Sequence, residues 1–318
     1  MTQNNTNIKD GEQVNAISDK GLLMFSLGSS VVRGRLVRSS DFIDDVLSWH
    51  NYPDAVNRYV RECIVMSVIF SSLFKYEGIF SVQINAEGPI TMLACDVTSK
   101  GDVRALATYD EQALAQIDAD DMYKDGGTIM FTVDNAETAR RYQGIVAIHN
   151  GSIEQSFSHY FNQSEQIPTE MMYVDKGDKL AALVVQKLPE DGGEEIRGVN
   201  KALSEDDQAE KENWNRAVML MKTCTQEELL SPDITNEELV FRLFHEEDVV
   251  LYSPMSLQAK CRCSAEKADR VLMTLPREDI KEISINGKIT FDCEFCNSKY
   301  VFDEEEITRR IEEMSNNA

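Results

Sequence analysis

Apolar residues recur in two spacings along the first 190 residues, and the two spacings predict different elements. Short apolar or alternating runs predict β-strands. These runs cover residues 22–37, 79–84, 90–97, 103–108, 128–133, 143–148, 171–174 and 180–188. Turn signals at residues 87–89 (Glu-Gly-Pro) and 99–101 (Ser-Lys-Gly) separate consecutive runs. The pattern is typical of an antiparallel meander, and Gly34 inside the first run is expected at a bulge or turn.

Helical spacing occurs between these runs. One helix is expected from Ser40 and a second after Pro53, with Val56, Val60 and Cys63 on one face. A third is expected over residues 153–161. The predicted fold class is therefore α+β, with a mostly antiparallel sheet and packed helices forming an N-terminal core domain over residues 21–189.

Composition changes after Pro189. Residues 190–213 contain nine acidic residues, three basic residues and three glycines, which predicts a solvated linker. Helical spacing resumes from Trp214 and again through residues 239–244. We expect a charged and helical linker over 190–254 and a small C-terminal domain over 255–318. Residues 1–20 are polar, lack the apolar segment of a secretory signal, and are expected to form a disordered leader.

Charge and hydropathy narrow the range of partners. The net charge of −23 repels phosphate backbones, so nucleic acid is not an expected partner. No apolar run approaches the roughly 20 residues of a membrane-spanning helix, so no membrane association is expected. We expect a cytoplasmic protein. In that compartment, seven cysteines favour metal binding or redox chemistry over structural disulfides.

Four of the cysteines form two close pairs near the C-terminus. Cys261 and Cys263 are one residue apart, Cys293 and Cys296 are two residues apart, and residues 264–292 separate the pairs. Zn²⁺ takes four thiolates in a tetrahedron, and each pair can chelate it with little loss of entropy. We predict one zinc ion per chain, held by these four residues. A unit this small depends on its metal for much of its folding free energy.

The same thiolates are open to oxidation. A sulfenic acid formed on one cysteine condenses with a neighbouring thiolate to a disulfide, which removes two ligands at once. Proximity makes Cys261 with Cys263 and Cys293 with Cys296 the easiest partners. A redox switch is thus chemically open to this site, and a purely structural zinc module is the simpler reading of the spacing alone.

Enzyme motifs do not accompany these cysteines. The chain has no GxxxxGK[ST] phosphate loop and no GxSxG elbow. His245 begins an HExxH-like run, but Val249 stands where the second histidine is required. Cys63 and Cys95 are expected in the core, and Cys224 in the linker has no assigned role. We therefore expect a protein that is not an enzyme.

Several segments together resemble the 33 kDa heat-shock chaperone family. Residues 160–169 (Tyr-Phe-Asn-Gln-Ser-Glu-Gln-Ile-Pro-Thr) are similar to that family's YFxxSEQxPT segment, and residues 142–146 (Tyr-Gln-Gly-Ile-Val) to its YQG strand. Residues 244–247 (Phe-His-Glu-Glu) and 274–276 (Thr-Leu-Pro) resemble further family positions beside the cysteines. The resemblance runs from about residue 22 to 302. Residues 181–182 (Ala-Ala) and 104–105 (Arg-Ala) differ from the family's usual Gly-Gly and Arg-Gly.

The resemblance implies a redox-regulated holdase of the stress response, which binds unfolding proteins without ATP. It implies that the reduced, zinc-bound chain is inactive. Oxidation to disulfides would release zinc, unfold the C-terminal unit and destabilise the linker, and the active form would be a homodimer. Trp214, Val218 and Met221 are candidates for the client-binding surface, and the alternative is that they pack on the core in every state.

A second function remains as an alternative. Zinc ribbons often act as structural modules that bind nucleic acid or protein. Asp292, Glu294 and residues 303–306 surround the last cysteines with negative charge, which opposes a phosphate-reading role.

Overall fold

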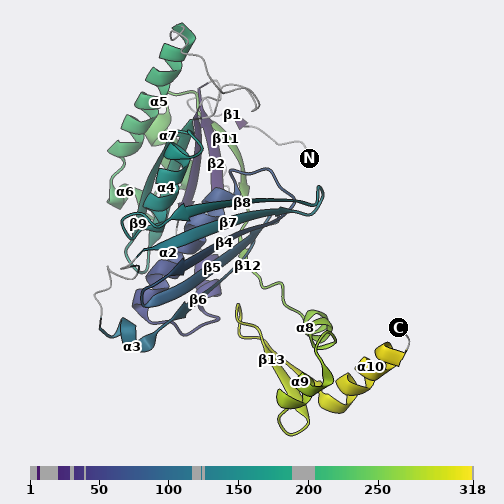
Figure 1. The fold of residues 1–318 in the computed structure, drawn as a ribbon. Coiled ribbons are helices and arrows are strands. Elements are labelled where there is room, and N and C mark those ends of the chain that lie inside the picture. The colour runs from purple at the N-terminus through teal and green to yellow at the C-terminus, as the bar shows by residue number, and fades with distance from the viewer. Residues whose placement is uncertain are drawn as a thin grey trace.

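The computed structural model describes residues 6–7, 21–28, 32–38, 41–116, 123, 126–187 and 205–316. Its fold is mixed α+β with antiparallel sheets, in agreement with the predicted class. Figure 1 shows the two large sheets with their helices, and a smaller C-terminal lobe that the chain enters after β12. Most of the expected leader, the last two residues of the expected core domain (188–189) and residues 190–204 of the expected linker lie outside the described residues.

The first sheet has the strand order β1-β11-β2-β3-β10-β9, with antiparallel neighbours throughout. Its strands are β1 (Thr6–Asn7), β2 (Leu22–Leu27), β3 (Val32–Arg38), β9 (Thr169–Asp175), β10 (Leu180–Lys187) and β11 (Val250–Met255). The predicted run 22–37 is therefore two strands. Gly34 lies inside β3 and not at a turn. A glycine is needed at this position because a Cβ there would collide with the ring of Phe25 on β2.

The second sheet has the order β12-β6-β5-β4-β7-β8. Its strands are β4 (Gly78–Ala86), β5 (Ile90–Thr98), β6 (Asp102–Tyr109), β7 (Gly127–Asn135), β8 (Arg140–Ala147) and β12 (Gln258–Ala259). The predicted meander holds for β4, β5 and β6. The β7–β8 hairpin then returns to pair with β4, and β12 adds to β6 as a parallel strand.

Helices fill the space between the sheets. They are α1 (Asp41–Leu47), α2 (Asp54–Ser71) and α4 (Ile153–Gln163), whereas the short α3 (Glu111–Leu114) has no buried residue. α2 packs on β5, β6, β4 and β3, so it is buried on nearly all sides. Cys63 on α2 and Cys95 on β5 lie in this core, as predicted. Burial raises the pKa of the Cys63 thiol to about 12, which keeps it protonated and inert.

Three helices cover the other face of the first sheet. They are α5 (Glu205–Thr223), α6 (Gln226–Leu229) and α7 (Asn236–Phe244). α5 packs on β10 and β3, and α7 packs on β2. The helix predicted from Trp214 starts earlier, because α5 already begins at Glu205. Acidic residues in a first turn suit the positive end of the helix dipole, so the charge run that suggested a linker also begins a helix.

The segment from β11 to β12, residues 250–259, crosses from one sheet to the other and is called the strap below. β11 pairs with β2, and β12 pairs with β6. The strap lies very close to two glycines. A Cβ on Gly21 would collide with the Met255 carbonyl oxygen, and one on Gly101 with that of Ser256. Both glycines also have positive φ, so no other residue fits there without strain.

The C-terminal lobe contains α8 (Ala265–Leu272), α9 (Arg277–Glu282), β13 (Lys288–Asp292), β14 (Lys299–Asp303) and α10 (Glu304–Asn316). α8, α9 and β13 lie between the two cysteine pairs, and β14 and α10, which no sequence pattern predicted, follow the second pair. Among the described residues, four buried side chains form the lobe's core: Leu272, Ile280, Ile289 and Ile307.

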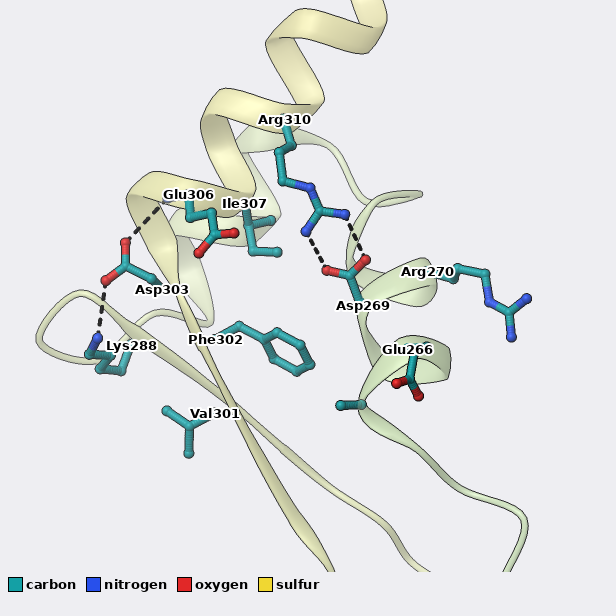
Figure 2. Close-up of a pocket in the computed structure, with 11 residues that line it drawn as sticks. Glu266, Asp269, Arg270, Lys288, Val301, Phe302, Asp303, Glu306, Ile307 and Arg310 are labelled. Atoms are coloured by element: carbon teal, nitrogen blue, oxygen red, sulfur yellow. Dashed lines mark hydrogen bonds and ion pairs between the residues drawn. The ribbon is translucent and has the colours of Figure 1, made fainter.

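Figure 2 shows how α10 is held in the lobe. Arg310 donates two hydrogen bonds to Asp269 of α8, at 2.6 and 2.7 Å, above an open groove of about 720 Å³ whose floor includes Phe302. At the start of α10, the Asp303 carboxylate accepts hydrogen bonds from the backbone N–H groups of Glu305 and Glu306. It also pairs with Lys288 on β13.

Candidate metal centre

The four paired cysteines meet in one cluster at the edge of the C-terminal lobe. Their sulfur atoms all lie within 4.8 Å of one another. The nearest sulfurs belong to different pairs: Cys263 and Cys296 are 3.4 Å apart, and Cys261 and Cys293 are 3.7 Å apart. Among the described residues, no other group of three or more potential metal ligands is this compact.

Local structure places each pair. The first pair follows β12 directly, and Ser264 then caps α8 by accepting a hydrogen bond from the Lys267 backbone N–H. The second pair forms the turn between β13 and β14. There the backbone N–H groups of Cys296 and Asn297 donate to the Cys293 carbonyl, and Asn297 adopts a φ of +55°. Both loops are thus fixed by their own hydrogen bonds.

The geometry fits a tetrahedral thiolate-bound ion. A tetrahedron with arms of about 2.3 Å has edges of roughly 3.8 Å. The two shortest sulfur separations lie near that value. Four sulfur donors with no oxygen or nitrogen among them suit Zn²⁺ and not Mg²⁺ or Ca²⁺. The cluster can therefore hold a metal, and its donor set favours zinc.

The thiols differ in acidity. Burial opposes ionisation of Cys261, but hydrogen bonds from the Cys263 backbone and the Arg104 guanidinium outweigh it and lower the pKa of Cys261 to about 7. Burial and the neighbouring thiols raise the pKa of Cys293 to about 12. Cys261 thus ionises near neutral pH, whereas the Cys293 thiol resists ionisation. A bound cation is what would deprotonate all four.

Residues outside the cysteine motif complete the surroundings, and no pattern in the sequence indicated them. The Tyr300 hydroxyl donates to Cys263 Sγ at 3.1 Å. An Arg104 N–H lies 3.7 Å from Cys261 Sγ, and the Arg104 guanidinium stacks on the Phe295 ring at 3.7 Å. Arg104 comes from β6, far away in the chain, so spacing alone could not connect it with the cysteines.

Solvent reaches the sulfurs through an opening between the lobe and the core domain. A cavity of about 430 Å³ is lined by Cys263 and Cys293, with Arg104, Arg262 and Lys267 beside them. A small oxidant has room to reach these sulfurs from this side.

The three residues predicted to bind clients lie on one face of α5. Met221 is buried, and Trp214 and Val218 are partly buried against the first sheet. Cys224 is buried in the same cluster, where burial raises the pKa of its thiol to about 11. This face is covered in the present structure, so its role in binding stays a prediction.

Two of the segments that carry the family resemblance, residues 142–146 and 160–169, lie together. The hydroxyls of Tyr142, on β8, and Tyr160, on α4, are 3.1 Å apart. Both donate to Glu165, with 3.0 Å from Tyr142 Oη to Glu165 Oε1. The YQG strand and the SEQ turn thus form one structural unit, away from the cysteines.

Comparisons with known proteins agree with this picture. The model of the Hsp33 protein family matches residues 21–303. A 33 kDa chaperonin of Pseudomonas fluorescens is 31% identical over 287 residues, which are 90% of this chain and 91% of the relative. One from Ectopseudomonas mendocina is 32% identical over 288 residues, or 90% and 92%. These names describe a chaperone and not an enzyme.

A solved structure has the same fold. The 33 kDa chaperonin (heat shock protein 33 homologue) of Thermotoga maritima matches with a TM-score of 0.73 and 18% identity, over 93% of this chain and 99% of the other. None of the described helices has the length and hydropathy to cross a membrane. Because the family model and the relatives span nearly the whole described chain, cysteine cluster included, the chain belongs to the Hsp33 family of chaperones.

Proposed function

We propose that the chain is a redox-regulated, ATP-independent holdase that is inactive while its four clustered cysteines hold one Zn²⁺. The observation that carries the proposal is the cluster itself: four sulfurs within 4.8 Å, at the edge of a lobe with a very small apolar core. A lobe of this kind needs its metal to stay folded. Whatever removes the metal therefore unfolds the lobe.

Oxidation by a peroxide supplies that removal. A thiolate attacks hydrogen peroxide, forming a sulfenic acid and releasing hydroxide. A neighbouring thiolate then attacks that sulfur, forming the disulfide and releasing a second hydroxide. Formation of each disulfide thus transfers two electrons from a pair of thiolates to one molecule of hydrogen peroxide. When bound, zinc keeps all four sulfurs as thiolates, which are the oxidisable form. Cys261 with Cys263 and Cys293 with Cys296 remain the proposed disulfides, because each pair is tethered by one or two residues.

The strap transmits the loss of the lobe to the linker helices. Its β12 end continues into the lobe. Its β11 end pairs with β2, on which α7 packs. Release of α5 would expose Trp214, Val218 and Met221 together with the apolar face of the first sheet. An exposed apolar face of this kind would bind unfolding proteins, and two such faces would support the homodimer that we propose for the active form. We propose the cytoplasm as its location.

The test is light scattering of a thermally unfolding protein without ATP. The zinc-loaded reduced chain and the peroxide-oxidised chain are compared, and released zinc is counted with a chromogenic chelator. We expect suppression of aggregation after release of one zinc per chain and none before it. Equal suppression by both forms would contradict the switch. A gel shift with nucleic acid would favour the zinc-ribbon alternative.

A further inference from the structure

The cysteine loops face the core domain with the residues that stand between their cysteines. Arg262 lies between Cys261 and Cys263, and it pairs with Asp96 on β5. Phe295 lies between Cys293 and Cys296, and its ring stacks under Arg104. Each loop therefore contributes one residue to the contact between lobe and core.

An ion cluster forms the centre of this contact. Asp96 is buried, and its Oδ2 accepts hydrogen bonds from Arg104 Nε at 2.8 Å and from Arg262. Ser81 holds the other carboxylate oxygen at 2.6 Å. One core carboxylate thus joins one arginine of the core and one of the lobe, and partial burial makes such charge-assisted bonds stronger than exposed pairs.

A second contact lies beside the first, in the loop between α1 and α2. His50 Nε2 is 3.0 Å from the Phe295 carbonyl oxygen. Asn297 Nδ2 donates to the Trp49 carbonyl oxygen at 2.6 Å. The turn that holds the second cysteine pair therefore contacts the core domain at two places, at Arg104 on β6 and in the loop between α1 and α2.

We propose that the core surface formed by His50, Asp96 and Arg104 is a docking site for the metal-loaded form of the two cysteine loops. Arg104 and Arg262 are then positioning residues, which hold the loops in the geometry of the metal site. When the metal is lost, their contacts between the loops and the core domain break. This inference rests on the zinc occupancy proposed above and goes beyond it, because it assigns a separate undocking step.

The physical reason lies in how the contact is divided between the loops. A shared metal fixes the two loops relative to each other, so Arg262 and Phe295 reach the core together. Without the metal, the loops move independently and the two contacts no longer reinforce each other. Four thiolates on one divalent ion also carry a charge of about −2, which Arg104 offsets at 3.7 Å from Cys261 Sγ. Disulfides carry no such charge.

The contact also leads directly into the core. Asp96 and Arg104 lie on neighbouring strands, paired with each other in register, and β12 pairs with the same β6. Undocking therefore removes charge contacts from the strand that anchors the strap. This gives the core a way to respond before the lobe has unfolded.

The experiment uses the full reduced chain loaded with zinc. Zinc affinity is measured by competition with a chromogenic chelator, and amide hydrogen exchange is measured for residues 47–52 of the core. In the unsubstituted chain, zinc removal should speed exchange at 47–52. Arg262→Gln, which removes no contact with a sulfur, should bring exchange of the zinc-loaded chain to the zinc-free level. Arg104→Gln should do the same and weaken zinc binding about tenfold.

Two matched substitutions separate docking from other effects. Tyr300→Phe removes a hydrogen bond to Cys263 Sγ without touching the core, so it should weaken zinc binding and leave 47–52 protected. Arg309→Gln breaks an exposed ion pair within α10 and should change neither quantity.

The outcomes distinguish the two proposals. If the unsubstituted chain binds no zinc, the proposed function fails at its metal. If it binds zinc but exchange at 47–52 does not depend on zinc, the docking inference is wrong and the metal site stands. Full protection of 47–52 in both arginine variants would likewise overturn docking.

Discussion

The core domain surrounds α2 with two sheets, so its apolar cluster draws on both sheets, α1, α2 and α4. The apolar cluster of the C-terminal lobe has four buried side chains among its described residues. The first region carries enough buried surface to fold by itself, whereas the second needs cross-links of another kind. The difference teaches that one chain can combine a domain that is stable by itself with a lobe whose stability depends on its cysteine cluster. Chemistry at the four sulfurs can therefore unfold the lobe and leave the core domain folded.

Removing one metal ligand tests this comparison most severely. Cys293→Ser should abolish tight zinc binding and unfold the lobe, because structural zinc contributes on the order of 10 kcal/mol to folding of such units. Limited proteolysis should then cut within residues 261–316 and spare the core domain. Cys224→Ala is the matched control, since this buried thiol lies in the linker cluster and should leave one zinc per chain. A protease-resistant lobe in Cys293→Ser would contradict the assignment.

Cavity-forming substitutions compare the two apolar cores directly. Ile307→Ala should cost the lobe about 2–5 kcal/mol. Because Ile307 is one of only four buried residues among those described in the lobe's apolar cluster, amide protection across α8, α9 and α10 should fall. Ile64→Ala makes the same chemical change on α2, and it should lower the melting temperature of the core domain without affecting the lobe. Unchanged protection of the lobe in Ile307→Ala would show that its metal alone maintains it.

The two regions should respond to pH in opposite directions. Burial, with the charges of Glu62 and Glu170, raises the pKa of Glu154 to about 7 in the folded core. Because this folded-state pKa exceeds the unfolded value of 4.5, the penalty is complete above pH 7 and disappears as pH falls toward 4.5. Glu154→Gln should therefore stabilise the core at pH 8, by on the order of 1 kcal/mol after allowance for solvent screening.

Urea unfolding of the core at pH 8 and at pH 5 measures this effect. The gain from Glu154→Gln should be present at pH 8 and nearly absent at pH 5. Zinc binding by the lobe should weaken over the same fall in pH, since protons compete for the thiolates. An equal gain at both pH values would contradict the buried-charge explanation.

The smallest expected effect concerns the attachment of α10. Arg310 and Asp269 form a two-bond pair whose side chains are 35% and 23% exposed, so Arg310→Gln should cost about 0.5–1 kcal/mol and less at high salt. Thermal unfolding of the zinc-loaded lobe at low and high salt measures it. Arg309→Gln, at a more exposed pair on the same helix, should cost less than Arg310→Gln. Equal costs would indicate that Arg310 does not clamp the helix.

Local patterns were enough to predict much of the fold. Alternation and turn signals predicted most strands of the core domain, because one buried face per strand leaves a period in the sequence. The run 22–37 predicts one strand because its apolar residues are nearly continuous, but the structure divides it after Leu27. Gly34 looks like a break, yet it lies inside β3, where the absence of a Cβ leaves room for the Phe25 ring. The start of α5 was missed because acidic residues suit both a linker and a helix N-terminus.

The cysteine cluster was predictable because its four residues lie in two short motifs. The residues around it were not. Arg104 and Asp96 reach the cysteines through tertiary contact, and nothing near them in the sequence indicates a metal. β14 and α10 were missed for a related reason: α10 buries little more than Ile307, so its apolar stripe is narrow.

The strap joins its two neighbours with very unequal strength. β12 is held to β6 over two residues, whereas β11 is held to both β1 and β2. Under thermal fluctuation or mechanical load, the shorter pairing opens first and the longer one holds. The strap is therefore a weak link followed by a strong one. By this reasoning, motion of the lobe should reach the edge of the second sheet before it reaches the first.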